Sequence, residues 1–231
     1  MIDINDKNKI IEMAQNGIFY GHKKTKTHPQ IKKYLGGRRN EIELLEPEFT
    51  ISSLNEALNF LSQVVTGKGI ILWVGTQPGA RDAIQMAAEQ FSHPYVNFRW
   101  LGGTLTNFSV IRKRVEYYAD LQNKQKSGEL AKYTKKEQLK FSKEISKLSR
   151  NLEGLKPLTK LPDVVFLVDG IVHKTAVREA NKIKIPIVAI IDTDDNPNLF
   201  QYPIFANDHA KASITWIINY FVEELKKVAK I

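Results

Sequence analysis

Basic side chains gather in one short segment near the start of the chain. Lysine attracts phosphate as a point charge, whereas arginine adds paired hydrogen bonds and a planar surface for stacking. Glycines in the same segment allow close approach of a backbone. Residues 21–40 therefore predict contact with phosphate groups, and the side chains expected to make it are His22, Lys23, Lys24, Lys26, Lys32, Lys33, Arg38 and Arg39.

A second group of basic residues lies near the middle of the chain. Arg99 stands beside Trp100, a pair that can stack on an unpaired base or on a sugar. Alternatively, Trp100 is buried at a hinge and Arg99 pairs with an acid; the sequence favours neither interpretation. Arg112, Lys113 and Arg114 span almost a full helical turn, so they cannot all face a buried seam.

The distribution of charge supports two contact regions. The chain has 34 Lys and Arg against 25 Asp and Glu, a net charge of +9. Residues 1–40 carry a net charge of +6 and residues 112–150 carry +7, whereas residues 41–111 carry −4 and residues 151–231 are neutral. Two positive segments on a neutral scaffold suit a surface that meets phosphate at two places. The alternative is a lysine-rich surface that only aids solubility.

One turn has the form of a phosphate-binding loop. In VGTQPGARDA, Gly75 and Gly79 lie between an apolar run and a predicted helix, where main-chain N–H groups can receive an anion. The loop matches neither G-x-G-x-x-G nor G-x-x-x-x-G-K-[ST], and Pro78 removes one donor. A tight turn is the favoured interpretation. A nucleotide-binding α/β enzyme that uses Gly75–Gly79 is the alternative function.

Conventional catalytic and metal-binding patterns are absent from the sequence. Asp192, Asp194 and Asp195 follow an apolar run and offer oxygen ligands for Mg²⁺, but their spacing is typical of an Asp/Asn/Pro turn. The five histidines are scattered, and the absence of cysteine excludes thiolate chemistry. We therefore expect no catalytic residue, no metal site and no cofactor.

The order of the apolar segments predicts an α/β domain with a parallel sheet of Rossmann or flavodoxin type. Uninterrupted apolar runs are typical of strands buried on both faces. Such runs occur at Gly69–Gly75, Leu161–Asp169 and Pro186–Ile191. Helices are expected at Pro47–Thr66, Gly79–Phe91 and His173–Lys182, with a last helix capped by Asp208. We expect residues 21–40 to form an extended loop and Glu41–Leu45 to form a short strand.

Residues 104–152 interrupt this alternation. Phe108, Ile111, Val115 and Tyr118 are spaced by 3, 4 and 3, and Phe141, Ile145, Leu148 and Leu152 by 4, 3 and 4. These are heptad spacings, and Ser127-Gly128 separates the two series. The pattern predicts an antiparallel, coiled-coil helical hairpin inserted into an α/β domain of residues 1–103 and 153–231. Each arm of the hairpin is about 30 Å long.

Several segments resemble the small-subunit ribosomal protein S2 family. FRWLGGTLTNF (Phe98–Phe108) resembles the family signature, and GIFYGHKKTKTHP (Gly17–Pro29) resembles its loop after the first helix. Further similar segments are ILWVGT, LPDVVFLVD, IPIVAIIDT and YPIFAND, which occur in the family's order. The long hairpin favours the bacterial or organellar branch. Gln77-Pro78, Phe205 and His209 depart from the family pattern, so roles tied to these positions do not transfer.

The resemblance implies a non-enzymatic protein that binds small-subunit ribosomal RNA. RNA contact would fall on Gly21–Arg39, on Arg99-Trp100 and on the basic faces of the hairpin. The implied partners are neighbouring small-subunit ribosomal proteins, including the large messenger-binding one where it is present. The resemblance implies no membrane contact and no homo-oligomer, and a place on the cytoplasmic ribosome of a bacterium or on an organellar ribosome.

Overall fold

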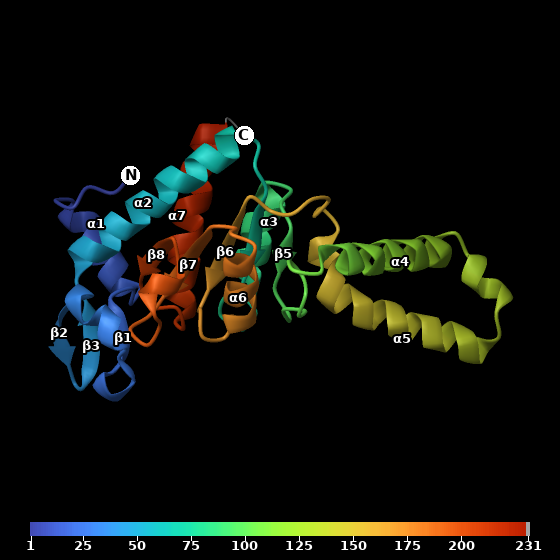
Figure 1. The fold of residues 1–231 in the computed structure, drawn as a ribbon, viewed down its shortest axis with the longest axis horizontal. Coiled ribbons are helices and arrows are strands. Elements are labelled where there is room, and N and C mark those ends of the chain that lie inside the picture. The colour runs from blue at the N-terminus through green and yellow to red at the C-terminus, as the bar shows by residue number, and fades with distance from the viewer. Residues whose placement is uncertain (230–231) are drawn as a thin grey trace.

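A five-stranded parallel sheet forms the centre of the protein, as the sequence predicts. In the computed structural model, which describes residues 1–229, the strands lie in the order β5-β4-β6-β7-β8 (Figure 1). Neighbouring strands are parallel, with Trp73 opposite Phe166 and Phe166 opposite Val188. The strands are β4 (Ile71–Val74), β5 (Tyr95–Val96), β6 (Val164–Val168), β7 (Ile187–Ile191) and β8 (Tyr202–Phe205).

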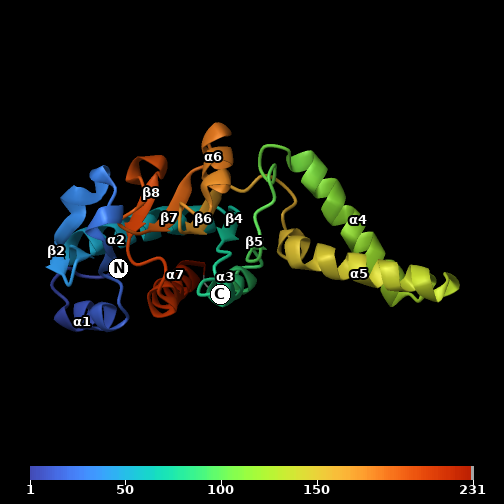
Figure 2. The same cartoon turned by 90° about the horizontal axis from the view of Figure 1, so that it is seen from below.

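Helices cover both faces of this sheet, which explains the uninterrupted apolar runs. Along β6, Phe166 lies in one core and its neighbours Val165 and Leu167 lie in the other, because successive side chains point to opposite faces. The first core packs against α2 (Pro47–Thr66), α3 (Arg81–Gln90) and α7 (Lys211–Ala229). The second packs against α6 (Lys174–Lys182), which lies on the opposite side of the sheet from α3 and α7 (Figure 2).

The basic N-terminal segment belongs to a second, antiparallel sheet. After α1 (Lys7–Gln15), the strands β1 (Tyr20–Lys23) and β2 (Leu35–Arg39) both pair with β3 (Ile42–Leu45). The prediction of an extended loop over residues 21–40 was therefore wrong. The segment lacks the alternation of apolar and polar residues that predicts a strand, and its strands form because β3 supplies hydrogen-bond partners to both.

Two long helices extend away from the sheet. α4 (Phe108–Lys126) leads outward and α5 (Lys135–Leu152) returns (Figures 1 and 2). α4 buries Ile111, Val115 and Tyr118, and α5 buries Ile145 and Leu152. Thr134 and Glu137 form a capping box at the start of α5. Within residues 1–229, no helix combines the length and apolar character that a membrane span requires.

The start of α7 differs from the prediction. The side chain of Asn207, not that of Asp208, accepts hydrogen bonds from the backbone N–H groups of His209 and Ala210, at 3.0 and 2.9 Å. Asp208 is buried, with only 1% of its surface exposed. Both residues suit a helix N-cap, and the tertiary structure instead uses Asp208 in a group of acids at the edge of the sheet.

Candidate nucleic-acid interface

The basic side chains of the antiparallel sheet point into solvent. Lys24 and Lys26 lie in one 3₁₀ turn (Lys24–Lys26), and Lys32 and Lys33 lie in another (Pro29–Tyr34). Arg38 pairs with Glu43 at 3.1 Å, which neutralises part of its charge. The exposed cations of this segment are Lys23, Lys24, Lys26, Lys32, Lys33, Arg38 and Arg39.

The basic segment is fastened to the turn that follows β7. The backbone N–H of His22 donates to Thr193 Oγ1 at 2.8 Å, and that of His28 donates to the carbonyl of Thr193 at 2.8 Å. Gly21 is required at this approach, because a Cβ there would lie 2.3 Å from Thr193 Cγ2. The exposed lysines are therefore held against the carboxyl edge of the parallel sheet.

The side chain of His22 faces inward. Its Nδ1 lies 3.0 Å from Asp192 Oδ2 and 3.7 Å from Asp194 Oδ1. The neighbouring carboxylate of Asp192 raises the pKa of His22, because it stabilises the charged imidazole. Two of the side chains predicted to bind phosphate in this segment thus have a buried acid as an internal partner: His22 has Asp192, and Arg38 has Glu43.

Four buried aspartates meet at the carboxyl edge of the sheet. Asp169 follows β6, Asp192 and Asp195 follow β7, and Asp208 follows β8; each is at most 3% exposed. Parallel strands bring their carboxyl ends to one edge, so residues far apart in the chain converge. The sequence analysis singled out Asp192 and Asp195 but missed Asp169 and Asp208. The missed signal was that Asp169 comes directly after an apolar run and that Asp208 comes two residues after the end of another.

These acids cannot all ionise together. Burial, followed by the charges of Asp208 and Asp169, raises the pKa of Asp195 to about 8. The imidazole of His209 contacts Asp208, and the hydrogen bond with this carboxylate raises the pKa of His209. The cluster therefore keeps a proton on Asp195 at neutral pH, and its carboxylates favour the cationic forms of His209 and His22.

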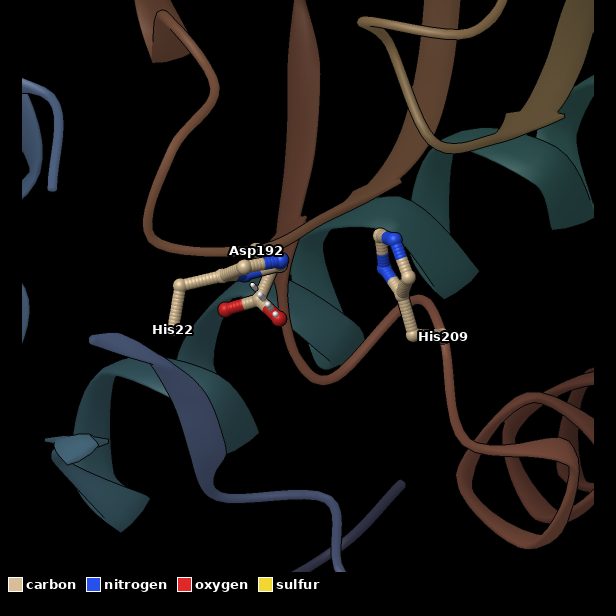
Figure 3. A group of neighbouring side chains, drawn as sticks. All are labelled: His22, Asp192 and His209. Carbon is tan, nitrogen blue, oxygen red and sulfur yellow. Dashed lines mark ion pairs between the residues drawn. The ribbon is translucent and has the colours of Figure 1, made fainter. Parts of the chain in front are cut away.

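Two histidines and one of these acids form a possible metal-ligand set. His22, Asp192 and His209 each present a ligand atom, and these atoms lie within 4.8 Å of one another (Figure 3). Imidazole and carboxylate are ligands that Zn²⁺ takes in proteins. Asp169, Asp208 and His209 form a second such set. The sequence shows no ligand spacing because the donors come from separate segments of the chain.

The loop before α4 is anchored by Glu179, a residue that the sequence analysis missed. Its carboxylate accepts hydrogen bonds from Trp100 Nε1 at 3.0 Å and from the backbone N–H of Gly103 at 2.8 Å. It also accepts from the N–H groups of Leu105 and Thr106 and from the Thr106 hydroxyl. Burial acts to raise the pKa of Glu179, but these hydrogen bonds outweigh it and hold the pKa below its usual value.

The hydrogen bond between Trp100 and Glu179 shows which part of each interpretation of the Arg99-Trp100 pair applies. Trp100 is half-buried and bonded at the hinge, as the structural interpretation proposed. Arg99 is exposed, and it forms no ion pair with any residue of the described part of the chain. The arginine is thus free to meet a partner while the tryptophan holds its position.

The predicted cations at the start of α4 have different surroundings. Arg112 lies 3.1 Å from Glu116 and donates to the carbonyl of Thr159 at 2.7 Å, so it links α4 to the segment that follows α5. Lys113 and Arg114 are exposed.

The sequence analysis missed three cations on α5, Lys143, Lys147 and Arg150. Their spacings of 4 and 3 are the signal of a single helix face.

The Gly75–Gly79 turn serves packing. A Cβ at Gly75 would lie 2.7 Å from Ile84 Cγ1, so glycine allows α3 to approach the sheet. The backbone N–H of Thr76 donates to His173 Nε2 at 3.3 Å, and its carbonyl accepts from Arg81 at 2.9 Å. Since these polar groups have internal partners, the geometry does not favour a nucleotide site.

Comparison with known proteins gives a consistent result. A family model described as Ribosomal protein S2 matches residues 13–227. Small ribosomal subunit protein uS2 of Dehalococcoides mccartyi is 38% identical over 208 residues, which cover 90% of this chain and 85% of the relative. The proteins of the same name from Hahella chejuensis and Tolumonas auensis are also 38% identical. These alignments cover 88% and 93% of this chain, and 80% and 89% of the relatives.

Proposed function

Since the chain belongs to the ribosomal protein S2 family, it is a structural constituent of the small ribosomal subunit, and we propose that exposed basic side chains bind it to small-subunit ribosomal RNA. Family membership implies a structural role rather than an enzymatic one. The observation that carries the RNA proposal is the row of exposed lysines at Lys23, Lys24 and Lys26, held rigidly through Gly21 and Thr193.

The predicted contact residues divide by whether their side chains already have a polar partner within the protein. His22, Trp100, Arg112 and Arg38 have such partners, so we assign them to shaping the interface rather than to phosphate contact. The exposed residues without an ion pair among residues 1–229 make the direct contacts in this proposal: Lys23, Lys24, Lys26, Lys32, Lys33, Arg39, Arg99, Lys113 and Arg114.

The binding mechanism is electrostatic. Each lysine or arginine that neutralises a phosphate releases a condensed counterion from the RNA, and this release drives association. The logarithm of affinity therefore falls with the logarithm of salt concentration, with a slope of roughly −0.7 to −0.9 per phosphate neutralised. Exposed cations contribute fully to this slope, whereas cations paired within the protein contribute less.

The remaining parts of the proposal concern assembly. Residues 104–152 act as a helical hairpin inserted into an α/β domain of residues 1–103 and 153–231. One copy of the chain sits in each small subunit beside neighbouring ribosomal proteins, including the large messenger-binding one where it is present. The ribosome is that of a bacterial cytoplasm or of an organelle, in line with the bacterial relatives.

The basic segment is tested by replacing Lys23, Lys24 and Lys26 together with alanine. Removing three phosphate contacts is expected to flatten the salt dependence of binding to small-subunit ribosomal RNA by about 2 to 3 logarithmic units per decade of salt. The measurement is the dissociation constant of the full chain at several KCl concentrations.

A matched control removes the same charge elsewhere. Lys7, Lys174 and Lys182 are exposed lysines on α1 and α6, away from the basic segment, and their replacement is expected to change the slope little. Equal slopes for the native chain and the Lys23, Lys24 and Lys26 variant would remove this segment from the interface. Native chain that sediments only in free fractions, apart from small subunits, would count against the ribosomal role itself.

A further inference from the structure

Asn16 and Gly17 form the single Asn-Gly pair of the sequence, and they come immediately after the last residue of α1. In such a pair the backbone nitrogen of the glycine can attack the side-chain amide carbon of the asparagine, because glycine has no side chain to hinder the approach. The proposed binding to RNA makes no use of these two residues. They are therefore a reactive site of a different kind.

The reaction is an intramolecular deamidation whose only co-reactant is water. The Gly17 nitrogen bonds to Cγ of Asn16, the bond from Cγ to Nδ2 breaks, and the proton lost by the Gly17 nitrogen leaves with Nδ2 as ammonia. Water then opens the cyclic imide. Cleavage at Cγ gives aspartate, whereas cleavage at the backbone carbonyl gives isoaspartate, in which the main chain runs through the side chain.

The folded protein engages both reacting groups in hydrogen bonds. The Gly17 N–H donates to the carbonyl of Ala14 at 3.0 Å, so the attacking nitrogen keeps its proton. The Asn16 side-chain amide donates to the carbonyl of Glu12 at 2.8 Å, which directs this side chain back along the helix. With φ of −81° and ψ of 0°, Asn16 has helical dihedrals, and ring closure requires rotation away from them. The docked α1 therefore blocks the reaction.

The helix α1 depends on tertiary contacts to stay folded. It has nine residues, fewer than the roughly 12–15 that an isolated helix needs in water. Met13 is the one fully buried residue among these nine, and a hydrogen bond of 2.6 Å from Trp216 Nε1 to Glu12 attaches the helix to α7. Terminal elements with few buried contacts open locally more often than the whole protein unfolds. Opening of α1 releases Asn16 and Gly17 together.

The segment after Gly17 has no room for a longer backbone. Ile18 is fully buried, and its carbonyl accepts from the N–H of Asn207 at 2.8 Å. The carbonyl of Phe19 accepts from the N–H of Leu45, on β3, at 2.9 Å. Isoaspartate adds a methylene group to the main chain just before these contacts. The helix α1 and the antiparallel sheet then cannot both keep their positions.

From these observations we infer that Asn16-Gly17 is a deamidation site that docking of α1 protects and undocking of α1 exposes. Chain that stays undocked is changed irreversibly, and its isoaspartyl form loses the position of the antiparallel sheet that carries the basic segment. This consequence for RNA binding rests on the proposed function. Protection of the site by the fold does not.

The first test measures the rate of deamidation of the full chain at mildly alkaline pH, in buffer and in concentrated urea. Mass spectrometry of the peptide that contains Asn16 reports the change from amide to acid, and enzymatic methylation of the isoaspartyl carboxyl separates isoaspartate from aspartate. We expect the reaction to be at least about 100-fold faster in urea, since the native chain reacts only through the small fraction in which α1 is open.

Two variants test whether docking of α1 is the protecting step. Glu12→Ala removes the acceptor of the Trp216 hydrogen bond and keeps a good helix former, so we expect the rate in buffer to rise about tenfold. In urea this variant should react as fast as the native chain. Lys7→Ala is the control: it changes an exposed residue of the same helix and should leave the rate within about twofold.

A third variant tests the consequence for binding. Asn16→Gln lengthens the side chain and disfavours ring closure, so its peptide should show no gain in mass. Native chain and Asn16→Gln are aged in urea, refolded and bound to small-subunit ribosomal RNA. We expect isoaspartyl chain to be depleted from the bound fraction of the native protein, whereas the aged variant binds as its fresh form does.

Several results would overturn the inference. Equal rates in buffer and in urea would show that the fold gives no protection. Equal acceleration by Glu12→Ala and Lys7→Ala would show that docking of α1 is not the protecting step. Isoaspartyl chain that binds the RNA as well as unmodified chain would remove the consequence for binding. Fresh native chain that does not bind the RNA would overturn the proposed function, and the rates in buffer and urea would still decide the deamidation site.

Discussion

Glu179 and Asp195 are both buried carboxylates of the α/β domain, but their surroundings are opposite. Five hydrogen-bond donors converge on Glu179, from Trp100 and from the loop residues that follow it. Asp195 accepts one backbone hydrogen bond, from Gly170 at 3.2 Å, and lies among other carboxylates. The two residues are similarly inaccessible, at 7% and 3% exposed, so burial alone does not distinguish them.

The pKa values follow the neighbours. At both sites burial favours the neutral acid. Around Glu179 the donors reverse this preference and lower the pKa, so the carboxylate is ionised at neutral pH. Around Asp195 the charges of Asp208 and Asp169 add to the effect of burial and raise the pKa to about 8. The same chemical group is thus an anion in one region and a neutral acid in the other.

This difference shows what each region can do. A buried carboxylate surrounded by donors is a fixed anchor. The carboxylate of Glu179 holds the loop before α4, and this loop positions Arg99. Carboxylates that surround one another favour protonation, and Asp195 keeps its proton at neutral pH for this reason. Glu179 thus fixes the geometry of a loop, whereas the charge of Asp195 depends on pH.

The largest effect is expected from removal of the anchor. Glu179→Ala leaves five donors without their acceptor, and we expect the free energy of unfolding to fall by about 3–5 kcal/mol. Glu179→Gln keeps one acceptor oxygen and should lose less. Urea unfolding of the two variants measures the difference.

The control for the anchor is an exposed acid. Glu116 pairs with Arg112 on the surface of α4, so Glu116→Ala should lower the free energy of unfolding by less than about 1 kcal/mol. If Glu179→Ala and Glu116→Ala destabilised the protein equally, the donors around Glu179 would not be energetically important and the comparison would fail.

A smaller, pH-dependent effect is expected at Asp195. In the unfolded chain this carboxyl ionises near its usual pKa, whereas the folded protein keeps it protonated up to about pH 8. The unfolded state therefore binds fewer protons between about pH 4 and 8, and the contribution of Asp195 to stability falls as pH rises through this window. Asp195→Asn removes the titration and keeps an acceptor for Gly170.

We therefore expect Asp195→Asn to match the native chain near pH 4 and to exceed its free energy of unfolding by about 2–4 kcal/mol at pH 8.5. Urea unfolding at intervals of one pH unit measures the growth of this difference. A constant difference across the range would show that Asp195 is already ionised in the folded protein.

The smallest effect is expected from removal of a neighbouring charge. Asp169→Asn deletes one of the carboxylates that raise the pKa of Asp195, so that pKa should fall by roughly one unit or less. Asparagine suits the position because Asp169 has a φ of +68°, a left-handed conformation that asparagine tolerates. Carboxyl ¹³C chemical shifts report the titration. Asp163→Asn, outside the cluster, should leave it unchanged.

Segments with strong local patterns were predictable. The helix at Pro47–Thr66 has the bounds that proline, the apolar spacing and Gly67 indicate, and three apolar runs are strands of the parallel sheet. The strands β1 and β2 were not predicted, because they depend on pairing with β3 and lack an alternation of apolar and polar residues. The local composition of a segment does not specify which other segment it pairs with.

The sequence by itself determined the order of apolar elements, the two basic segments and the motifs of the S2 family. Tertiary structure alone decided which charges are already paired. His22 meets Asp192 across 170 residues of chain, and Trp100 meets Glu179 across 79. Electrostatic interaction falls with distance in space, not along the chain, so only the folded protein separates the internal charges from those left for RNA.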